Sequence, residues 1–243
     1  MERGPLQDKW IVVTGAARRL GRRFAIVCAR NGANLVIHYG HSAPEAASLK
    51  AEIEKLGRSA HVIGADFTDA NQLHRFTRAL DGLPSLHALV NSAAIFEDVA
   101  FATTDVATWE RHLTINLTAP FLLSQAFARV FAEDSGGQIV NILDWRATRP
   151  GADHFPYAIT KSALAAMTRA LAIALAPRIA VNGLALGAVL SPADTTSSRS
   201  EVQAVPLRRV AADGEAEAAL IFLLSGGYTT GEILHVDGGR HLI

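Results

Sequence analysis

Apolar and polar positions alternate in blocks along the 243 residues of this chain. Short apolar runs, many of them rich in β-branched residues, predict strands that are buried on both faces. These runs cover residues 10–14, 34–38, 60–64, 86–91, 138–143, 178–184 and 233–236. Between them, apolar residues at three- and four-residue spacing predict helices. The helices are expected at residues 20–30, 44–56, 69–80, 105–131, 155–176 and 213–224.

Three residues mark how these helices begin or bend. Ser42 and Asp69 stand at the start of the second and third predicted helices and are candidate N-caps. Pro120 lies near the middle of the 105–131 region. Because proline lacks a backbone N–H and clashes with the preceding turn, it should bend this region or divide it into two helical pieces.

The strict alternation of strand and helix predicts a single-domain α/β protein. Its doubly wound fold contains a parallel sheet of about seven strands with helices on both faces. Residues 1–243 suit one such domain, and no repeat or linker divides them. The stretch 187–205 is rich in Ser, Thr, Pro and Ala and has no regular pattern. We expect it to be a substrate loop that acts as a lid.

Composition narrows the class of protein. Basic and acidic residues number 23 each, which argues against nucleic acid or an anionic membrane as the main partner. Cys28 is the single cysteine, so an internal disulfide is excluded and a reducing compartment is favoured. The first nine residues carry no apolar signal segment, and no run approaches the roughly 20 apolar residues of a membrane span. We therefore expect a soluble cytoplasmic protein.

The segment from Thr14 to Gly21 joins the first predicted strand to the first predicted helix. Free backbone amides at a helix N-terminus, together with the positive end of the helix dipole, suit a pyrophosphate group. Gly15 permits a tight turn, and Gly21 permits close packing of the helix on the sheet. This segment therefore predicts a dinucleotide site.

The end of the second strand indicates which dinucleotide binds. An NAD site usually places an acidic residue there for the ribose 2′-hydroxyl, and none is present. A 2′-phosphate could instead be surrounded by Arg18, Arg19, His38, His41 and Ser42, which favours NADPH over NADH. The arginines could also be solvated surface charges, and the histidines have no further ligand nearby for a metal site.

A Tyr and a Lys that lie four residues apart carry the candidate chemistry. Tyr157 and Lys161 fall on one face of a helix, where a lysine ammonium should lower the pKa of the phenol. Such a Tyr can exchange a proton with a carbonyl or an imine at neutral pH. Asp144 stands thirteen residues before Tyr157, at the end of a predicted strand.

Several short motifs together resemble the short-chain dehydrogenase/reductase family along nearly the whole chain. They are Thr14-Gly15 with Gly21, Asn91-Ser92-Ala93-Ala94, Asn116, Tyr157 with Lys161, Asn182-Gly183, and Val236-Asp237-Gly238-Gly239. The resemblance implies a Rossmann-type sheet, a nicotinamide cofactor and a homotetramer.

Two departures from the family pattern resemble the pteridine reductases and the dihydromonapterin reductases. Arg19 replaces the middle glycine of the turn, and Asp144 replaces the usual catalytic serine. Phe96 matches the position where that subgroup stacks a pterin ring, although it could also be an ordinary core residue. Ala94, Ile95 and the loop 191–200 do not match this subgroup closely.

The resemblance also implies a role for each matching residue. Tyr157 would donate the proton, Lys161 would hold the nicotinamide ribose, and Asn116 would hold a water that links Lys161 to solvent. Substrate contacts are expected at Phe96, Asp144 and Tyr157. Asp66 could accept a hydrogen bond from the adenine amino group, or it could be a turn residue. The expected NADPH/NADP+ contacts are Thr14, Gly15, Arg18, Arg19, Leu20, Gly21, His38, Tyr39, Ser42, Asp66, Phe67, Asn91, Ser92, Ala93, Tyr157, Lys161, Gly187 and Val189.

Three functions fit these residues. The first is NADPH-dependent reduction of a dihydropterin to a tetrahydropterin, since the Asp144 carboxylate can accept from the N–H groups of a pterin edge. The second is a carbonyl reductase of the same family, such as a 3-oxoacyl-carrier-protein reductase. The third is a cofactor-binding regulator that has lost catalysis, and the intact Tyr157, Lys161 and Asn116 speak against it.

Overall fold

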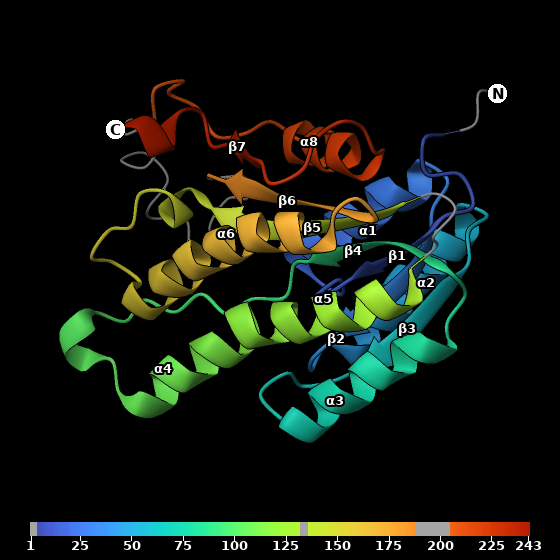
Figure 1. Cartoon of the computed structure of the whole chain (residues 1–243), viewed down its shortest axis with the longest axis horizontal. Coiled ribbons are helices and arrows are strands. Elements are labelled where there is room, and N and C mark those ends of the chain that lie inside the picture. The colour runs from blue at the N-terminus through green and yellow to red at the C-terminus, as the bar shows by residue number, and fades with distance from the viewer. Residues whose placement is uncertain (1–3, 132–135, 188–204) are drawn as a thin grey trace.

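The computed structural model describes residues 4–131, 136–187 and 205–243. Seven parallel strands form one sheet in the order β3-β2-β1-β4-β5-β6-β7 (Figure 1). The strands are β1 (Trp10–Val13), β2 (Asn34–Tyr39), β3 (Ala60–Gly64), β4 (Leu86–Asn91), β5 (Gly137–Asp144), β6 (Ile179–Leu186) and β7 (Ile233–Val236). The predicted α/β fold with a parallel sheet of seven strands is confirmed.

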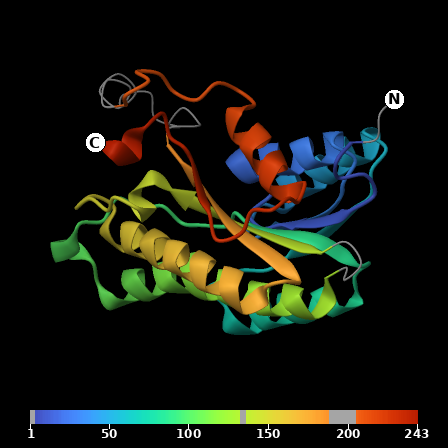
Figure 2. The same cartoon turned by 45° about the horizontal axis from the view of Figure 1, so that its top comes forward.

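Helices cover both faces of the sheet, as Figure 2 shows. One core cluster joins the sheet to α1 (Arg19–Arg30), α2 (Ala43–Lys55) and α8 (Glu215–Leu224). A second cluster joins the other face to α3 (Ala70–Ala79), α5 (Ala119–Val130) and α6 (Phe155–Leu175). The five inner strands are almost fully buried, because apolar side chains on both of their faces meet a helix layer, whereas the edge strands β3 and β7 are partly exposed.

The strand order places a ligand crevice at one edge of the sheet. β1 has β2 on one side and β4 on the other, so the loops that follow β1 and β4 diverge. Open α/β sheets bind their ligands at such a point, outside the carboxyl ends of the strands. Asp144 at the end of β5 pairs in register with Leu186 of β6, so Gly187 follows at the same edge.

The helical region 105–131 differs from a simple kinked helix. α4 (Val106–Leu113) is followed by a π-helical turn (Thr114–Thr118), in which the Ala119 amide donates to the Thr114 carbonyl, and then by α5. Pro120 lies in the first turn of α5 and cannot donate to the carbonyl four residues before it. The helix widens to a π-helical turn at this point and then continues as α5.

Of the two predicted N-caps, Asp69 is confirmed and Ser42 is not. Asp69 caps α3, since its carboxylate accepts from the amides of Asn71 and Gln72. Ser42 stands at the N-cap position of α2, but its side chain forms no capping hydrogen bond. The Ser42 hydroxyl therefore does not cap α2.

Helix α6 has the length and mean hydropathy of a membrane span, contrary to the expectation that no run comes close. The core helix of a soluble protein meets the same criterion. In the structure α6 packs with Leu164 and Ala165 against Leu143 of β5 and Ala185 of β6. Its apolar composition therefore has an explanation in the packing of the sheet.

We expect Gly21→Ala to destabilise the protein. A Cβ at Gly21 would lie 2.3 Å from the Gly15 carbonyl oxygen, so α1 must shift away from the turn. Overpacking of this kind costs about 1–3 kcal/mol, to be measured as the free energy of unfolding in denaturant. Gly82→Ala is the control, because a Cβ there meets nothing within 4 Å. Equal stability of the two variants would contradict the close approach.

Candidate active site

The glycine turn after β1 is held against the loop that follows β4. The Thr14 hydroxyl oxygen accepts from the amides of Ser92 and Ala93, both at 2.9 Å, and thereby joins the ends of β1 and β4. Gly15 has φ +63°, and a Cβ there would lie 2.9 Å from the Cα of Ala93. Arg18, at the N-cap of α1, forms no side-chain capping bond. The first amides of α1 are thus free of a side-chain cap, which fits a pyrophosphate.

Basic residues surround this helix end. Arg18, Arg19 and Arg22 line a surface hollow together with Pro44 and Ser48 of α2. Arg22 is held by Glu52 at 2.7 Å, whereas the side chain of Arg18 is 65% exposed and lies 3.9 Å from the Glu45 carboxylate. Arg19 is exposed as well and has φ +50°, a conformation that suits the glycine usual at this position. Arg18 and Arg19 are therefore the cations best placed for a 2′-phosphate.

His38 has a structural role, which corrects the expectation that its imidazole faces the phosphate. Its Nδ1 accepts from the Gly15 amide at 3.0 Å, and its Nε2 donates to the Ala65 carbonyl at 2.9 Å. The ring is 2% exposed and stacks on Phe67 with 4.0 Å between centroids. Burial lowers the pKa of His38 to about 4, although the bond to Ala65 opposes this shift. Both nitrogens are therefore occupied in a neutral ring.

Other predicted cofactor residues contribute mainly to the frame of the site. Phe67 is buried beneath His38, and the Tyr39 ring lies against Gly64. Asp66 is a turn residue, as one alternative predicted, since its Oδ1 accepts from the amide and hydroxyl of Thr68. Its contact with adenine stays a prediction.

Three more predicted cofactor positions are Asn91 at the end of β4, Gly187 directly after β6, and Val189. The side chain of Asn91 is buried and donates to the Asn141 side chain at 2.8 Å, so it links β4 to β5. Gly187 is required where it stands, because a Cβ would lie 2.8 Å from the Cα of Asp237. Val189 and the loop residues 188–204 lie outside the described residues.

The structure brings the predicted catalytic residues together. The Tyr157 hydroxyl donates to Oδ2 of Asp144 at 3.3 Å. Lys161 is 3% exposed, and its Nζ donates to the Ile142 carbonyl at 2.7 Å while lying 5.5 Å from the Tyr157 ring centroid. The carboxylate, the phenol and the ammonium thus form one cluster at the edge of the sheet.

The expected lowering of the Tyr157 pKa by Lys161 is wrong for this arrangement. Burial raises the pKa of Tyr157 well above its usual value, and the charge of Asp144 and the hydrogen bond to it raise it further. Arg146 lowers the pKa in part. Burial and a carboxylate in direct contact therefore decide the direction of the shift, while the Lys161 ammonium donates to a backbone carbonyl. The phenol keeps its proton, as a proton donor must.

Asn116 anchors the substrate side of the site. Its Oδ1 accepts from the Ile95 amide at 2.9 Å, and its Nδ2 donates to the Ile95 carbonyl and to the Thr160 hydroxyl. This amide group therefore joins the loop that carries Phe96 to helix α6. The predicted role of Asn116 in holding a water stays a prediction.

Phe96 faces the open side of the site and is not a core residue. It is 54% exposed, stacks on His154 with 4.0 Å between centroids, and meets the Tyr157 ring edge-on at 4.7 Å. An exposed aromatic ring beside the proton donor suits a flat substrate.

Arg146, Asp153 and His154 also contact the residues of the site, and no motif in the sequence indicates them. The Arg146 amide and guanidinium contact Asp144, and the guanidinium also pairs with Asp153. His154 supports Phe96 and contacts the Glu97 carbonyl through its Nδ1. Arg146 stands two residues after Asp144, so its proximity was the one available signal.

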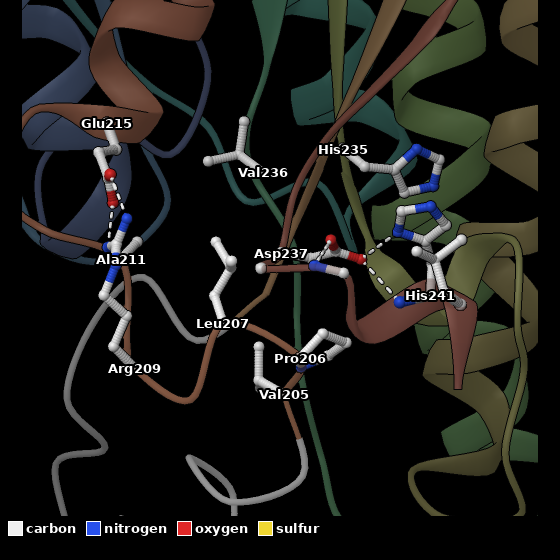
Figure 3. A pocket seen from close by; sticks show the side chains of 13 residues that line it. Val205, Pro206, Leu207, Arg209, Ala211, Glu215, His235, Val236, Asp237 and His241 are labelled. Atoms are coloured by element: carbon white, nitrogen blue, oxygen red, sulfur yellow. Dashed lines mark hydrogen bonds and ion pairs between the residues drawn. The ribbon is translucent and has the colours of Figure 1, made fainter.

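A cavity lies beside the carboxyl end of β7, and Asp237, which follows β7, lines it (Figure 3). Asp237 accepts from the amides of Gly239 and His241 and from Nδ1 of His241. His235 stacks on His241 and contacts the Thr148 hydroxyl at 3.1 Å. The C-terminal turn is thereby held against the segment that follows Asp144. Among the described residues, no group of His, Cys, Asp and Glu could hold a metal ion.

A parallel sheet with a glycine turn at its switch point and a Tyr–Lys pair beside it defines a nicotinamide-dependent oxidoreductase. A family model described as short chain dehydrogenase matches residues 9–202. The chain belongs to this family.

Solved and curated relatives agree with this assignment. The structure of FolM alternative dihydrofolate reductase 1 from Brucella canis, complexed with NADP, has a TM-score of 0.91 and 31% identity, covering 100% of this chain and 97% of that one. The 3-oxoacyl-[acyl-carrier-protein] reductase FabG of Aquifex aeolicus is 32% identical over 96% of this chain and 98% of its own length. The L-rhamnose 1-dehydrogenase (NAD(P)(+)) of a Sphingomonas species is 31% identical over 98% of both. The NADP-type cofactor is confirmed at the level of the family and its solved relatives.

We expect the activity to fall as the pH rises through about 8. Burial lowers the pKa of Lys161 to about 8, and Asp144 opposes this shift. The ammonium is therefore present below this pH and is lost above it, so kcat/KM for NADPH, which reports on the free enzyme, should decline there. Lys161→Arg keeps the cation and should move the decline to higher pH. An unchanged pH profile in that variant would assign the decline to another group.

Arg19→Ala should weaken NADPH selectively. Loss of a charge-assisted contact with the 2′-phosphate should raise KM for NADPH about tenfold and leave KM for NADH within about twofold. Arg30→Ala is the matched control, since Arg30 is exposed at the far end of the same helix. A similar loss for both cofactors would show that Arg19 does not read the 2′-phosphate.

Proposed function

We propose that the protein is an NADPH-dependent pterin reductase that converts a dihydropterin to a tetrahydropterin. The contact of Asp144 with Tyr157 carries the proposal. A carboxylate accepts hydrogen bonds only, so it suits the N–H and amino groups along one edge of a pterin. The likeness to the FolM structure over the whole chain supports the same substrate class.

The residues of the site divide the work of reducing a C=N bond. Oδ2 of Asp144 accepts from the N–H groups of the substrate, and Phe96 covers the flat ring. Tyr157 holds a proton on its hydroxyl and transfers it to the ring nitrogen. Lys161 places a buried positive charge beside this phenol. The hydride for the ring carbon would come from NADPH held by the glycine turn and the arginines at the start of α1.

The residues described at the cofactor end fit this cofactor. Gly15 and Gly21 stand where a Cβ would collide with neighbouring backbone, and Arg18 and Arg19 lie at the start of the same helix. We propose that the backbone of this turn holds the pyrophosphate and that the two arginines hold the 2′-phosphate. Assembly as a homotetramer and a cytoplasmic location stay predictions.

Reduction of a carbonyl is the second candidate. The similarity to the Aquifex FabG favours it, at 32% identity over nearly all of both chains. NADPH oxidation, followed by absorbance with dihydropterins, folates and acetoacetyl thioesters in parallel, separates the two. Turnover of the pterins is expected, and turnover of thioesters alone would overturn the first proposal. Saturable NADPH binding without turnover of any substrate would favour a regulator.

Asp144→Ser should separate the substrates further. It removes the carboxylate that accepts from the pterin edge, so kcat/KM for the dihydropterin should fall roughly 100-fold or more while thioester reduction is retained or gained. Tyr157→Phe is the companion variant and should lower both activities by about 10²–10⁴-fold, because it removes the proton donor. Full pterin activity in Asp144→Ser would contradict the role given to the carboxylate.

A further inference from the structure

The Asp144 carboxylate uses its two oxygens differently. Oδ1 accepts from the Arg146 amide at 2.8 Å and from Arg146 Nη1 at 3.4 Å. Oδ2 accepts from the Tyr157 hydroxyl. An Asp side chain can rotate about its last bond with little resistance, so the two oxygens become distinct only if one is held. Both contacts come from residue 146, the shorter from its backbone amide and the longer, at 3.4 Å, from its guanidinium, and only the second depends on the arginine side chain.

Arg146 is itself fixed from a second direction. Its Nε donates to Oδ2 of Asp153 at 3.1 Å, and Nη2 pairs with the same oxygen. Asp153 stands just before α6, and Tyr157 lies in the first turn of that helix. The guanidinium therefore joins the end of β5, which carries Asp144, to the start of the helix that carries Tyr157. It spans the two segments whose separation sets the contact between these catalytic residues.

The surroundings of the guanidinium are those of a rigid, partly buried cation. The Arg146 side chain is 15% exposed, and its Cζ lies 4.5 Å from the Trp145 ring centroid and 5.8 Å from that of Phe96. Burial alone would lower the pKa of Arg146, but the bonds to Asp153 and the charge of Asp144 raise it overall. A planar fork that pairs with two carboxylates and stacks on a ring is a geometry that lysine cannot reproduce.

We propose that Arg146 is a positioning residue that turns Oδ2 of Asp144 toward Tyr157 and the substrate. It acts through Asp144 and does not contact the reacting atoms. The inference rests on the proposed function, in which Oδ2 receives the N–H groups of the substrate. Asp153 holds the far side of the guanidinium and has a smaller effect on the same property.

A double-mutant cycle tests whether Arg146 acts through Asp144. The four proteins are the wild type, Arg146→Ala, Asp144→Ser and the double variant. Arg146→Ala should lower kcat/KM for the dihydropterin by about 10–100-fold, the range for a hydrogen bond to a charged group. In the Asp144→Ser background the same change should cost less than about twofold, because no carboxylate is left to orient. Equal losses in both backgrounds would overturn the proposal.

Further readouts separate positioning from general stabilisation. Added guanidinium ion should restore part of the activity of Arg146→Ala and none in the double variant, and Arg146→Lys should recover less than added guanidinium does. Asp153→Asn should lower kcat/KM by roughly threefold. Arg149→Ala is the matched control, since Arg149 is exposed in the same segment. If Arg146→Ala does not fold, Arg146→Lys takes its place in the cycle.

The substrate panel for the wild type is measured first, so the two proposals can fail separately. Turnover of thioesters alone overturns the pterin proposal, and the cycle is then run with the thioester to test the positioning. Turnover of the dihydropterin with equal losses in both backgrounds overturns only the role of Arg146. A wild type that turns over neither substrate overturns both.

Discussion

The hydrogen bond between the Tyr157 hydroxyl and the Asp144 carboxylate is the interaction on which the site depends. It joins the last residue of β5 to the first turn of α6, two elements that pack together through Leu143 and Leu164. Burial raises the pKa of the Tyr157 phenol, and the charge of the carboxylate and the hydrogen bond to it raise the pKa further. The packing of α6 on β5 thus holds the two groups in contact.

Positive charge surrounds this bond on two sides. Lys161 lies beneath the Tyr157 ring, and Arg146 holds the other oxygen of Asp144. Oδ2 of Asp144 and the Tyr157 hydroxyl are paired with each other, and the exposed Phe96 meets the Tyr157 ring edge-on. A flat molecule with N–H donors beside a basic ring nitrogen matches these groups better than a simple ketone does, which is the physical basis of the proposed pterin substrate.

At the predicted cofactor site, one residue that was expected to bind the cofactor has a structural role instead. His38 stands near the end of β2, where a phosphate ligand could be expected, yet its ring accepts from the Gly15 amide and donates to the Ala65 carbonyl. A neutral, buried imidazole stacked on Phe67 cannot also meet a phosphate in solvent. The arginines at the start of α1 remain exposed and are the residues proposed for that role.

The sequence alone determined the alternation of strands and helices along the chain, the Asp69 cap and the Tyr157–Lys161 pair. Each depends on residues close together in the chain, since burial period, capping and one helical turn are local properties. Arg146 has its partners Asp144 and Asp153 close to it in the sequence, and only the conformation of the intervening segment shows that the three side chains meet. The tertiary structure also decided the role of His38, whose partners come from other segments, and the direction of the Tyr157 pKa shift. Burial and approach between distant segments set these properties, and no local pattern records them.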